Sequence, residues 1–282
     1  MPFKDVLLVV ATYPDPTPIS AVEGAVDFAA ALGAKVSAVA CEVKIQAPVS
    51  VFGNLLIDIP AMVAAECKKS EANAQNLLDA FQRFSEKHGV FQDRILERCR
   101  IVEIPDLLVG HARLRDLTII PTPDGGFLEQ SYATPIIFGS GRPTLIIPHM
   151  RRHHRTFALD TAVIAWDFSR PAARAVADSL PILQKTKKVR VVTVTNEKAI
   201  DTKRSGADLA KHLAHHDIDV VLDRVDAAGR SIGRTLESYI ESYDPDLLVM
   251  GAYGHSRIRD FILGGATKSM LSRPPVPIFL SH

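Results

Sequence analysis

Apolar and polar positions along the chain alternate in blocks that predict strands and helices in regular succession. Short runs rich in Val, Ile and Leu are typical of buried strands, and longer stretches with apolar residues at helical spacing are typical of amphipathic helices. The longest predicted helix, 61–88, carries Leu77, Leu78, Phe81 and Phe84 on one face. The predicted strands are 6–11, 35–43, 95–101, 117–120, 144–147, 162–166, 189–195, 219–225, 247–250 and 276–280, and the predicted helices are 20–32, 61–88, 105–114, 171–183, 201–215, 231–243 and 267–272.

The order of these elements repeats once along the chain. Strands that alternate with helices pair in parallel through right-handed crossovers, which gives a doubly wound sheet with helices on both faces. A polar, charged stretch at 149–156 separates two apolar strands and divides the two series. The sequence therefore predicts an α/β protein with two tandem doubly wound domains, residues 1–150 and 156–282.

One literal repeat does not follow this order. Residues 105–109 and 245–249 both read PDLLV, but the order of elements makes 117–120 the counterpart of the strand after Pro245. The first PDLLV then falls on a helix, and we interpret the match as coincidence.

Composition restricts the classes of function. The 282 residues are 47% hydrophobic and 23% charged, which is typical of a globular protein with a substantial core. A net charge of +1 argues against nucleic acid as a main partner, and no apolar run is long enough to span a membrane. The three cysteines lack metal-type spacing, and we expect a cytoplasmic protein.

A glycine-rich segment between the predicted strand 247–250 and the helix 267–272 carries the most specific signal. Gly251, Gly254 and Gly264 form the pattern G-x2-G-x9-G. Such a loop lets a ligand approach the backbone, and the helix N-terminus that follows offers N–H groups to a phosphate. The spacing closely resembles the nucleotide-binding signature of the universal stress protein family. That signature continues with Ser or Thr, where this chain has Gly265.

The resemblance covers the whole chain and implies a tandem universal stress protein with a Rossmann-like fold of the adenine-nucleotide alpha-hydrolase-like type. It implies a cytoplasmic protein that binds ATP, or AMP or ADP, and it leaves open whether Mg²⁺ accompanies the nucleotide. The two halves would pair with each other through their last strands. Whether two chains then form a homodimer is left open. The implied nucleotide-binding residues are Asp167, Val194, Gly251, Gly254, His255, Gly264, Gly265, Ala266 and Thr267.

The resemblance also implies a role for each of these residues. Asp167, after the strand 162–166, would reach the adenine, and the Val194 backbone would contact the base. Gly251 and Gly254 would shape the turn after the strand 247–250. The phosphates would receive N–H groups from Gly264, Gly265, Ala266 and Thr267, with the Thr267 hydroxyl as a further donor left open. His255, inside the glycine pattern, would contact ribose or phosphate or be exposed at the surface. A carboxylate at a strand end also suits the ligand crevice of an open parallel sheet.

Each of three site residues has a structural alternative. Asp167 is also placed to cap the helix that begins near Pro171, Val194 is an ordinary residue for a buried strand, and Thr267 is placed to cap the last helix.

The first half does not carry the glycine pattern. Aligning the predicted strands places Pro121 opposite Gly251, Asp124 opposite Gly254, and residues 133–135 opposite Gly264. Proline cannot adopt a positive φ. We therefore expect no ATP site of the same type in the first half, which serves as a pairing partner or holds a different ligand.

Two further features are open to interpretation. The loop 45–60 is too apolar for a solvated connection, and it either folds over its own domain or binds an apolar ligand or a second chain. His212, His215 and His216 have a spacing that can bind zinc, but no carboxylate or thiol accompanies them, so we interpret them as a solvated helix end.

The sequence favours a binding protein over an enzyme. No nucleophile and base occur in a motif, so we assign no catalytic residue and no metal ligand. The leading prediction is a regulatory, stress-response binder of ATP or a related adenine nucleotide in the second half. The alternatives are a module that binds a small molecule or protein through the loop 45–60, and a slow ATPase.

Overall fold

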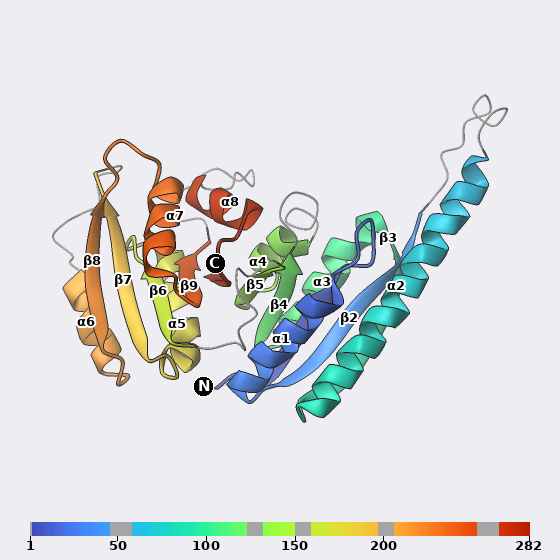
Figure 1. Ribbon diagram of the computed structural model, residues 1–282, viewed down its shortest axis with the longest axis horizontal. Coiled ribbons are helices and arrows are strands. Elements are labelled where there is room, and N and C mark those ends of the chain that lie inside the picture. The colour runs from blue at the N-terminus through green and yellow to red at the C-terminus, as the bar shows by residue number, and fades with distance from the viewer. Residues whose placement is uncertain (1, 46–57, 123–131, 150–158, 197–205, 253–264) are drawn as a thin grey trace.

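The computed structural model describes residues 2–45, 58–122, 132–149, 159–196, 206–252 and 265–282 (Figure 1). Both halves alternate strands and helices as predicted. The first half contains β1 (Asp5–Val10), α1 (Ile19–Leu32), β2 (Lys35–Lys44), α2 (Ile59–Lys87), β3 (Phe91–Arg100), η1 (Ile101–Glu103), α3 (Ile104–Arg113), β4 (Leu117–Thr122), α4 (Thr134–Gly139) and β5 (Thr144–Pro148). The second half contains β6 (Thr161–Ala165), α5 (Arg170–Leu183), β7 (Lys188–Thr195), α6 (Gly206–Ala214), β8 (Val220–Asp226), α7 (Ile232–Tyr243), β9 (Leu247–Gly251), α8 (Gly265–Ser272) and β10 (Ile278–Ser281).

The strands of both halves join in one ten-stranded sheet, in the order β3-β2-β1-β4-β5-β10-β9-β6-β7-β8. Pairing is parallel within each half, and β10 pairs antiparallel with β5, with Phe279 opposite Leu145. The predicted pairing of the two halves through their last strands is therefore confirmed, and it merges the two expected sheets into one continuous sheet.

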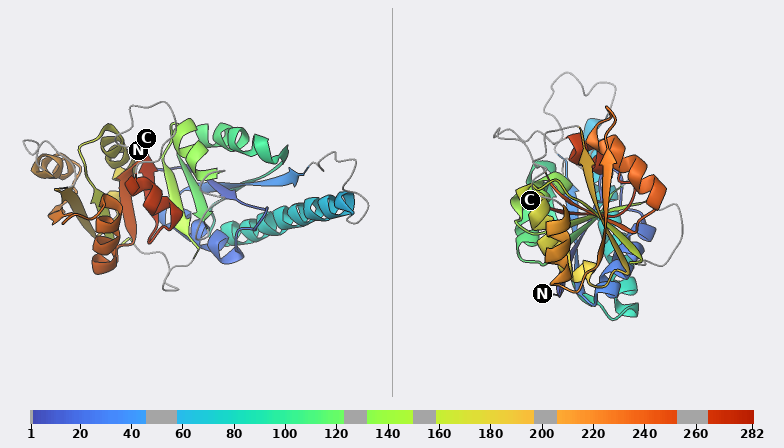
Figure 2. Two further views of the ribbon diagram at one scale, coloured as in Figure 1. Left: turned by 90° about the horizontal axis from the view of Figure 1, so that it is seen from above. Right: turned by 90° about the vertical axis from the view of Figure 1, so that its left-hand side faces the viewer.

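Helices cover both faces of this sheet, which twists strongly along its length (Figure 2). One apolar cluster lies under α1, α2, α5 and α6, and a second lies under α3, α4, α7 and α8. The inner strands are buried on both faces, as expected for parallel strands that read as continuous apolar runs. The predicted face of α2 packs into the first cluster through Leu77, Leu78 and Phe81.

The two halves repeat each other in detail. The carboxylate of Asp116 accepts hydrogen bonds from the N–H groups at the start of β1, Lys4 at 2.8 Å and Asp5 at 3.1 Å. The carboxylate of Asp246 accepts the same pair of bonds at the start of β6, from Asp160 at 2.9 Å and Thr161 at 3.0 Å. Asp116 therefore corresponds to Asp246. The first PDLLV segment lies in α3 and the second leads into β9, so the literal repeat is coincidental.

Side chains also join the halves outside the sheet. The Lys185 ammonium, beyond the end of α5, donates to the carbonyls of Ala31 at 3.1 Å and Leu32 at 2.9 Å in the last turn of α1. A cation there satisfies helix-end carbonyls that have no partner within the helix. The rings of Phe3 and Phe279 contact each other, with centroids 6.3 Å apart.

Some predicted boundaries were wrong. β3 begins four residues before 95, and Ile101 belongs to the short helix η1. The helix α4 was not predicted, because Pro135 and Gly139 near its ends are residues that usually interrupt helices.

Several predicted features lie outside the described residues: most of the domain boundary at 149–156, the start of the helix predicted at 201–215, and most of the apolar loop 45–60, including Phe52 and Leu56. In the described part of the chain, every helix is too short or too polar to cross a membrane.

Candidate functional site

The candidate site lies at the carboxyl ends of β6 and β9. These two strands are neighbours in the sheet. From β6 the chain continues to β7 on one side, and from β9 it continues to β10 on the other side. An open parallel sheet forms a ligand crevice at such a switch in strand order. Because Ala165 pairs with both Val192 and Met250, the register places Asp167 level with Val194 on one side and with Ala252 on the other.

Asp167 begins the turn from β6 to α5. Its Oδ1 accepts a hydrogen bond from the N–H of Ser169 at 3.0 Å. The alternative that Asp167 caps α5 is wrong, because Ser169 is the N-cap and its Oγ accepts from the N–H of Ala172 at 3.2 Å. The carboxylate of Asp167 is therefore held in place by the turn that precedes the helix, with its second oxygen left for another contact.

Val194 lies at the end of β7 with its side chain and its backbone in different surroundings. Its side chain is buried in the second apolar cluster, as the structural alternative expects. Its backbone, however, points along the sheet. The carbonyl of Val192 accepts from the N–H of Trp166 at 2.9 Å, so the polar groups of Val192 face β6. Alternation along a strand turns those of Val194 the same way, beyond the end of β6 and beside Asp167.

Gly251 ends β9, and its position explains why a side chain is excluded. A Cβ placed there would lie 2.4 Å from the nitrogen of Ala172 and 2.5 Å from the carbonyl carbon of Pro171. Real Cβ atoms do not approach other atoms so closely. Gly251 therefore lets the first turn of α5 pack directly on the end of β9, which fixes the turn that carries Asp167 against that strand end.

The first turn of α8 consists of Gly265, Ala266 and Thr267. The alternative that Thr267 caps this helix is wrong, since the helix begins two residues earlier and Thr267 is buried within it. N–H groups in a first turn have no partner within the helix, so those of Gly265 and Ala266 can serve an anion. No described heavy atom lies within 4 Å of the place where a Cβ of Gly265 would stand.

Residues that the sequence did not single out hold α8 in position. Gly233 in α7 lets Ser269 approach to 3.0 Å from the place of a Cβ, and Ala266 to 3.6 Å. The Ser269 hydroxyl donates to the Glu237 carboxylate. The signal for this contact is a glycine inside a predicted helix, which often marks a close packing position.

Three turns that follow β6, β7 and β8 have strained backbones. Phe168 after β6, Asn196 after β7 and Ala228 after β8 all have positive φ, at 59°, 64° and 49°. Such conformations are unfavourable for residues other than glycine, and they cluster at functional sites. Hydrogen bonds from the Ala228 N–H and the Asn196 side chain hold the pKa of Asp226 below its usual value.

The structure thus brings Asp167, Val194, Gly251 and the first turn of α8 to one edge of the second half. The predicted site residues Gly254, His255 and Gly264 lie outside the described residues.

The corresponding crevice of the first half is filled by its own side chains. The repeat places Ala11 where the second half has Asp167, Cys41 where it has Val194, and Pro121 where it has Gly251. The carbonyl of Cys41 accepts from the Thr12 hydroxyl, and the N–H of Val43 donates to Ser70 Oγ at 3.0 Å. The backbone of β2 at this edge is therefore already hydrogen-bonded.

A buried aromatic side chain lies near this edge of the first half. Tyr132, two residues before α4, is almost completely buried near the thiols of Cys41 and Cys99. Burial raises the pKa of Tyr132 and of Cys41, because the charged forms lose solvation.

Comparisons with known proteins also distinguish the second half from the first. The model of the universal stress protein family matches residues 159–282. No curated protein sequence matches the chain. A universal stress protein from Archaeoglobus fulgidus DSM 4304 has 16% identity and a TM-score of 0.65, over 98% of this chain and 97% of its own. A Pseudomonas aeruginosa UCBPP-PA14 structure described as a universal stress protein has 13% identity and a TM-score of 0.60, over 99% and 93%.

A shorter universal stress protein, solved in complex with cAMP, aligns with 44% of this chain and 97% of its own at 17% identity and a TM-score of 0.33. The similarity to the two full-length structures establishes the tandem fold. The family model matches the half that carries the glycine pattern. The second half of the chain, residues 159–282, thus matches the universal stress protein family, and the two halves together have the tandem fold of the two full-length structures.

Proposed function

We propose that the chain is a binding protein for ATP or a related adenine nucleotide, AMP or ADP, with one site in the unit 156–282 and none of this type in the unit 1–150. The base would lie between Asp167 and the backbone of Val194. The phosphates would lie at the glycine-rich segment and the first turn of α8. The bound nucleotide would change the contacts of a stress-response regulator in the cytoplasm, where the three free thiols would stay reduced.

The observation that carries this proposal is that a carboxylate and a helix N-terminus meet at one switch in strand order. The carboxylate of Asp167 is held by its own turn, and the packing of α5 on Gly251 fixes that turn against the end of β9. The first turn of α8 lies at the same edge. The carboxylate suits the adenine, and the helix N-terminus suits the phosphates. The open space at Gly265 fits a phosphate, although the missing hydroxyl removes one donor from the family pattern.

The test is an equilibrium titration of the full chain with ATP, with and without Mg²⁺, compared with two variants. Gly254→Val alters the glycine-rich segment and should abolish binding. Asp124→Val is the matched change at the aligned position of the first half and should leave the dissociation constant unchanged. Absence of binding by the wild type at millimolar ATP, or equal binding by Gly254→Val, would overturn the proposal.

A further inference from the structure

Two residues at the end of β10 hold the backbone of Ala252, the first residue after β9. The N–H of Ala252 donates to the carbonyl of Ser281 at 2.8 Å. The carbonyl of Ala252 lies 3.0 Å from Nδ1 of His282, and because a carbonyl only accepts, Nδ1 carries the proton. Ala252 is completely buried, so both of its polar groups depend on these partners. Ser281 and His282 thus hold both polar groups of Ala252 just beyond the end of β9.

The same imidazole ring contacts the first half. It packs edge-on against Phe138 of α4, with ring centroids 4.8 Å apart. The mark for the C-terminal end in Figure 1 lies between α8 and α4, where the two halves meet. His282 therefore touches the half without the glycine pattern on one side and the beginning of the candidate site on the other.

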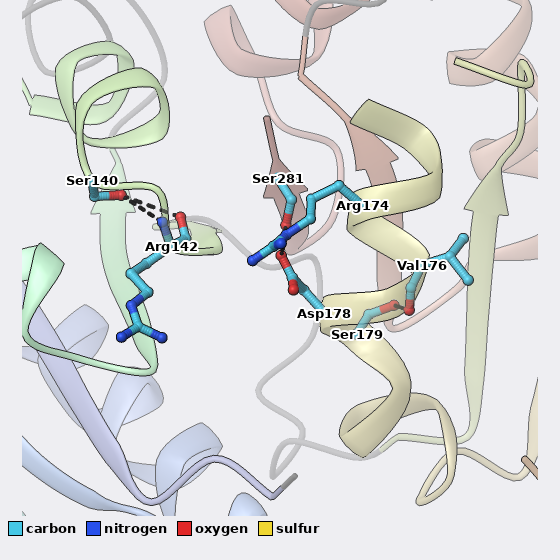
Figure 3. A network of polar contacts seen from close by, with 7 residues as sticks. All are labelled: Ser140, Arg142, Arg174, Val176, Asp178, Ser179 and Ser281. Atoms are coloured by element: carbon cyan, nitrogen blue, oxygen red, sulfur yellow. Dashed lines mark hydrogen bonds and ion pairs between the residues drawn. The ribbon is translucent and has the colours of Figure 1, made fainter. Parts of the chain in front are cut away.

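Ser281 ties the same strand end to α5. Its hydroxyl donates to Asp178 Oδ2 at 3.0 Å, and this carboxylate also pairs with Arg174 at 2.8 Å (Figure 3). The first turn of α5 in turn packs against Gly251. Contacts therefore connect the end of β10, the helix α5 and the end of β9. His282 connects these three elements to the first half through Phe138.

We propose that His282 is a positioning residue of the nucleotide site, which holds Ala252 level with Asp167 and couples that position to Phe138 of the first half. The inference rests on the proposed nucleotide binding. Loss of the Nδ1 donor leaves a buried carbonyl without a partner, and the end of β9 must shift to reach another donor or water. A shift there displaces the strand end that lies level with Asp167, where we propose that the base binds.

The experiment compares the ATP dissociation constants and melting temperatures of three variants with those of the full-length wild type. His282→Phe keeps a ring against Phe138 and removes the donor, and it should weaken ATP binding about tenfold. His282→Asn keeps a side-chain N–H within reach of the carbonyl but removes the ring that contacts Phe138, and it should weaken ATP binding only about threefold. Phe138→Leu removes only the ring contact, and it should weaken binding about threefold.

The outcomes separate this inference from the proposed function. A wild type that does not bind ATP overturns both. If the wild type binds ATP, an unchanged dissociation constant in His282→Phe, with or without a lower melting temperature, shows a merely structural role and overturns the inference. Equal weakening by His282→Asn and His282→Phe overturns the role of the hydrogen bond. An unchanged constant in Phe138→Leu overturns the coupling to the first half.

Discussion

The carboxyl edges of the two halves share one backbone frame and differ in what occupies it. In the second half, Asp167 and the glycine at 251 border a crevice with strained turns. In the first half, Ala11 and Pro121 stand at the same positions, and Thr12 hydrogen-bonds the backbone that a base would contact. A few side chains at strand ends therefore distinguish the edge for which we propose a ligand site from the edge that side chains fill.

The helices that follow the second strand of each half make the difference larger. α2 has 29 residues, and it sends Ser70 and Asn73 to the first-half crevice, where Asn73 donates to the carbonyl of Thr12 at 3.0 Å. α6 has only 9 described residues. Within the described residues, all five non-glycine residues with positive φ belong to the second half. Strain is thus concentrated in the half for which we propose a ligand.

The largest expected effect comes from adding one methyl group at the strand end of the second half. Gly251→Ala places a Cβ about 2.4 Å from the α5 backbone and should lower the free energy of unfolding by about 4 kcal/mol. Gly110→Ala, in α3 of the first half, meets no described atom within 4 Å and should raise that free energy by about 0.5–1 kcal/mol. Chemical denaturation of both variants measures the difference, and equal stabilities would show that α5 does not press on Gly251.

The same position on the second strand of each half provides the next comparison. Arg190 in β7 is buried and makes two hydrogen bonds to Asp223, each 2.9 Å long, whereas Ser37 in β2 has a buried hydroxyl without a partner in the described residues. Asp223→Ala should lower the free energy of unfolding by about 3 kcal/mol, because it leaves a buried cation unpaired. Ser37→Ala should change it by less than about 0.5 kcal/mol. A stable Asp223→Ala protein in denaturant titration would contradict this account of the network.

Removal of the hydroxyl group should lower the stability at one buried tyrosine and should not lower it at another. Tyr239 donates to Asp223 and accepts from Arg190 at 2.9 Å, so Tyr239→Phe should cost about 1–2 kcal/mol of unfolding free energy. The Tyr132 hydroxyl has no hydrogen-bond partner in the described residues, so Tyr132→Phe should leave stability unchanged or raise it by up to about 1 kcal/mol. Thermal unfolding of the pair is the measurement, and a destabilised Tyr132→Phe would show that this hydroxyl has a partner.

The smallest expected effect restores the family pattern at the start of α8. Gly265→Ser introduces the hydroxyl that the chain lacks, at a position with no described atom within 4 Å of the new Cβ. One additional hydrogen bond to a phosphate should tighten ATP binding about threefold to tenfold. Titration with ATP measures the change, with Gly265→Ala as the control that adds a Cβ without a hydroxyl. Equal affinities for the two variants would place the phosphates elsewhere.

Much of the fold could be predicted from the sequence, because buried parallel strands are nearly continuous apolar runs. Strands such as β4 and β7, and the apolar face of α2, therefore stand out. The helix α4 does not, since its packing against α3 depends on the close contact of Gly139 with Val109 rather than on a periodic pattern.

The candidate site was predictable only where it has a local signature. The strand-end position of Asp167 and the glycines around 251 are visible in the sequence. The reason for Gly251 is not, because the atoms that exclude its side chain belong to Pro171 and Ala172, far away in the sequence. The same holds for His282, whose partners Phe138 and Ala252 come from different halves.

The stoichiometry of ATP binding to the full-length chain, measured by calorimetry, tests most directly the claim that only one of the two crevices is a nucleotide site. We predict one nucleotide per chain for the wild type and for Ala11→Val, which changes the first-half counterpart of Asp167. We predict strongly weakened binding for Asp167→Ala. Two nucleotides per chain, or one nucleotide with unchanged affinity in Asp167→Ala, would contradict the account.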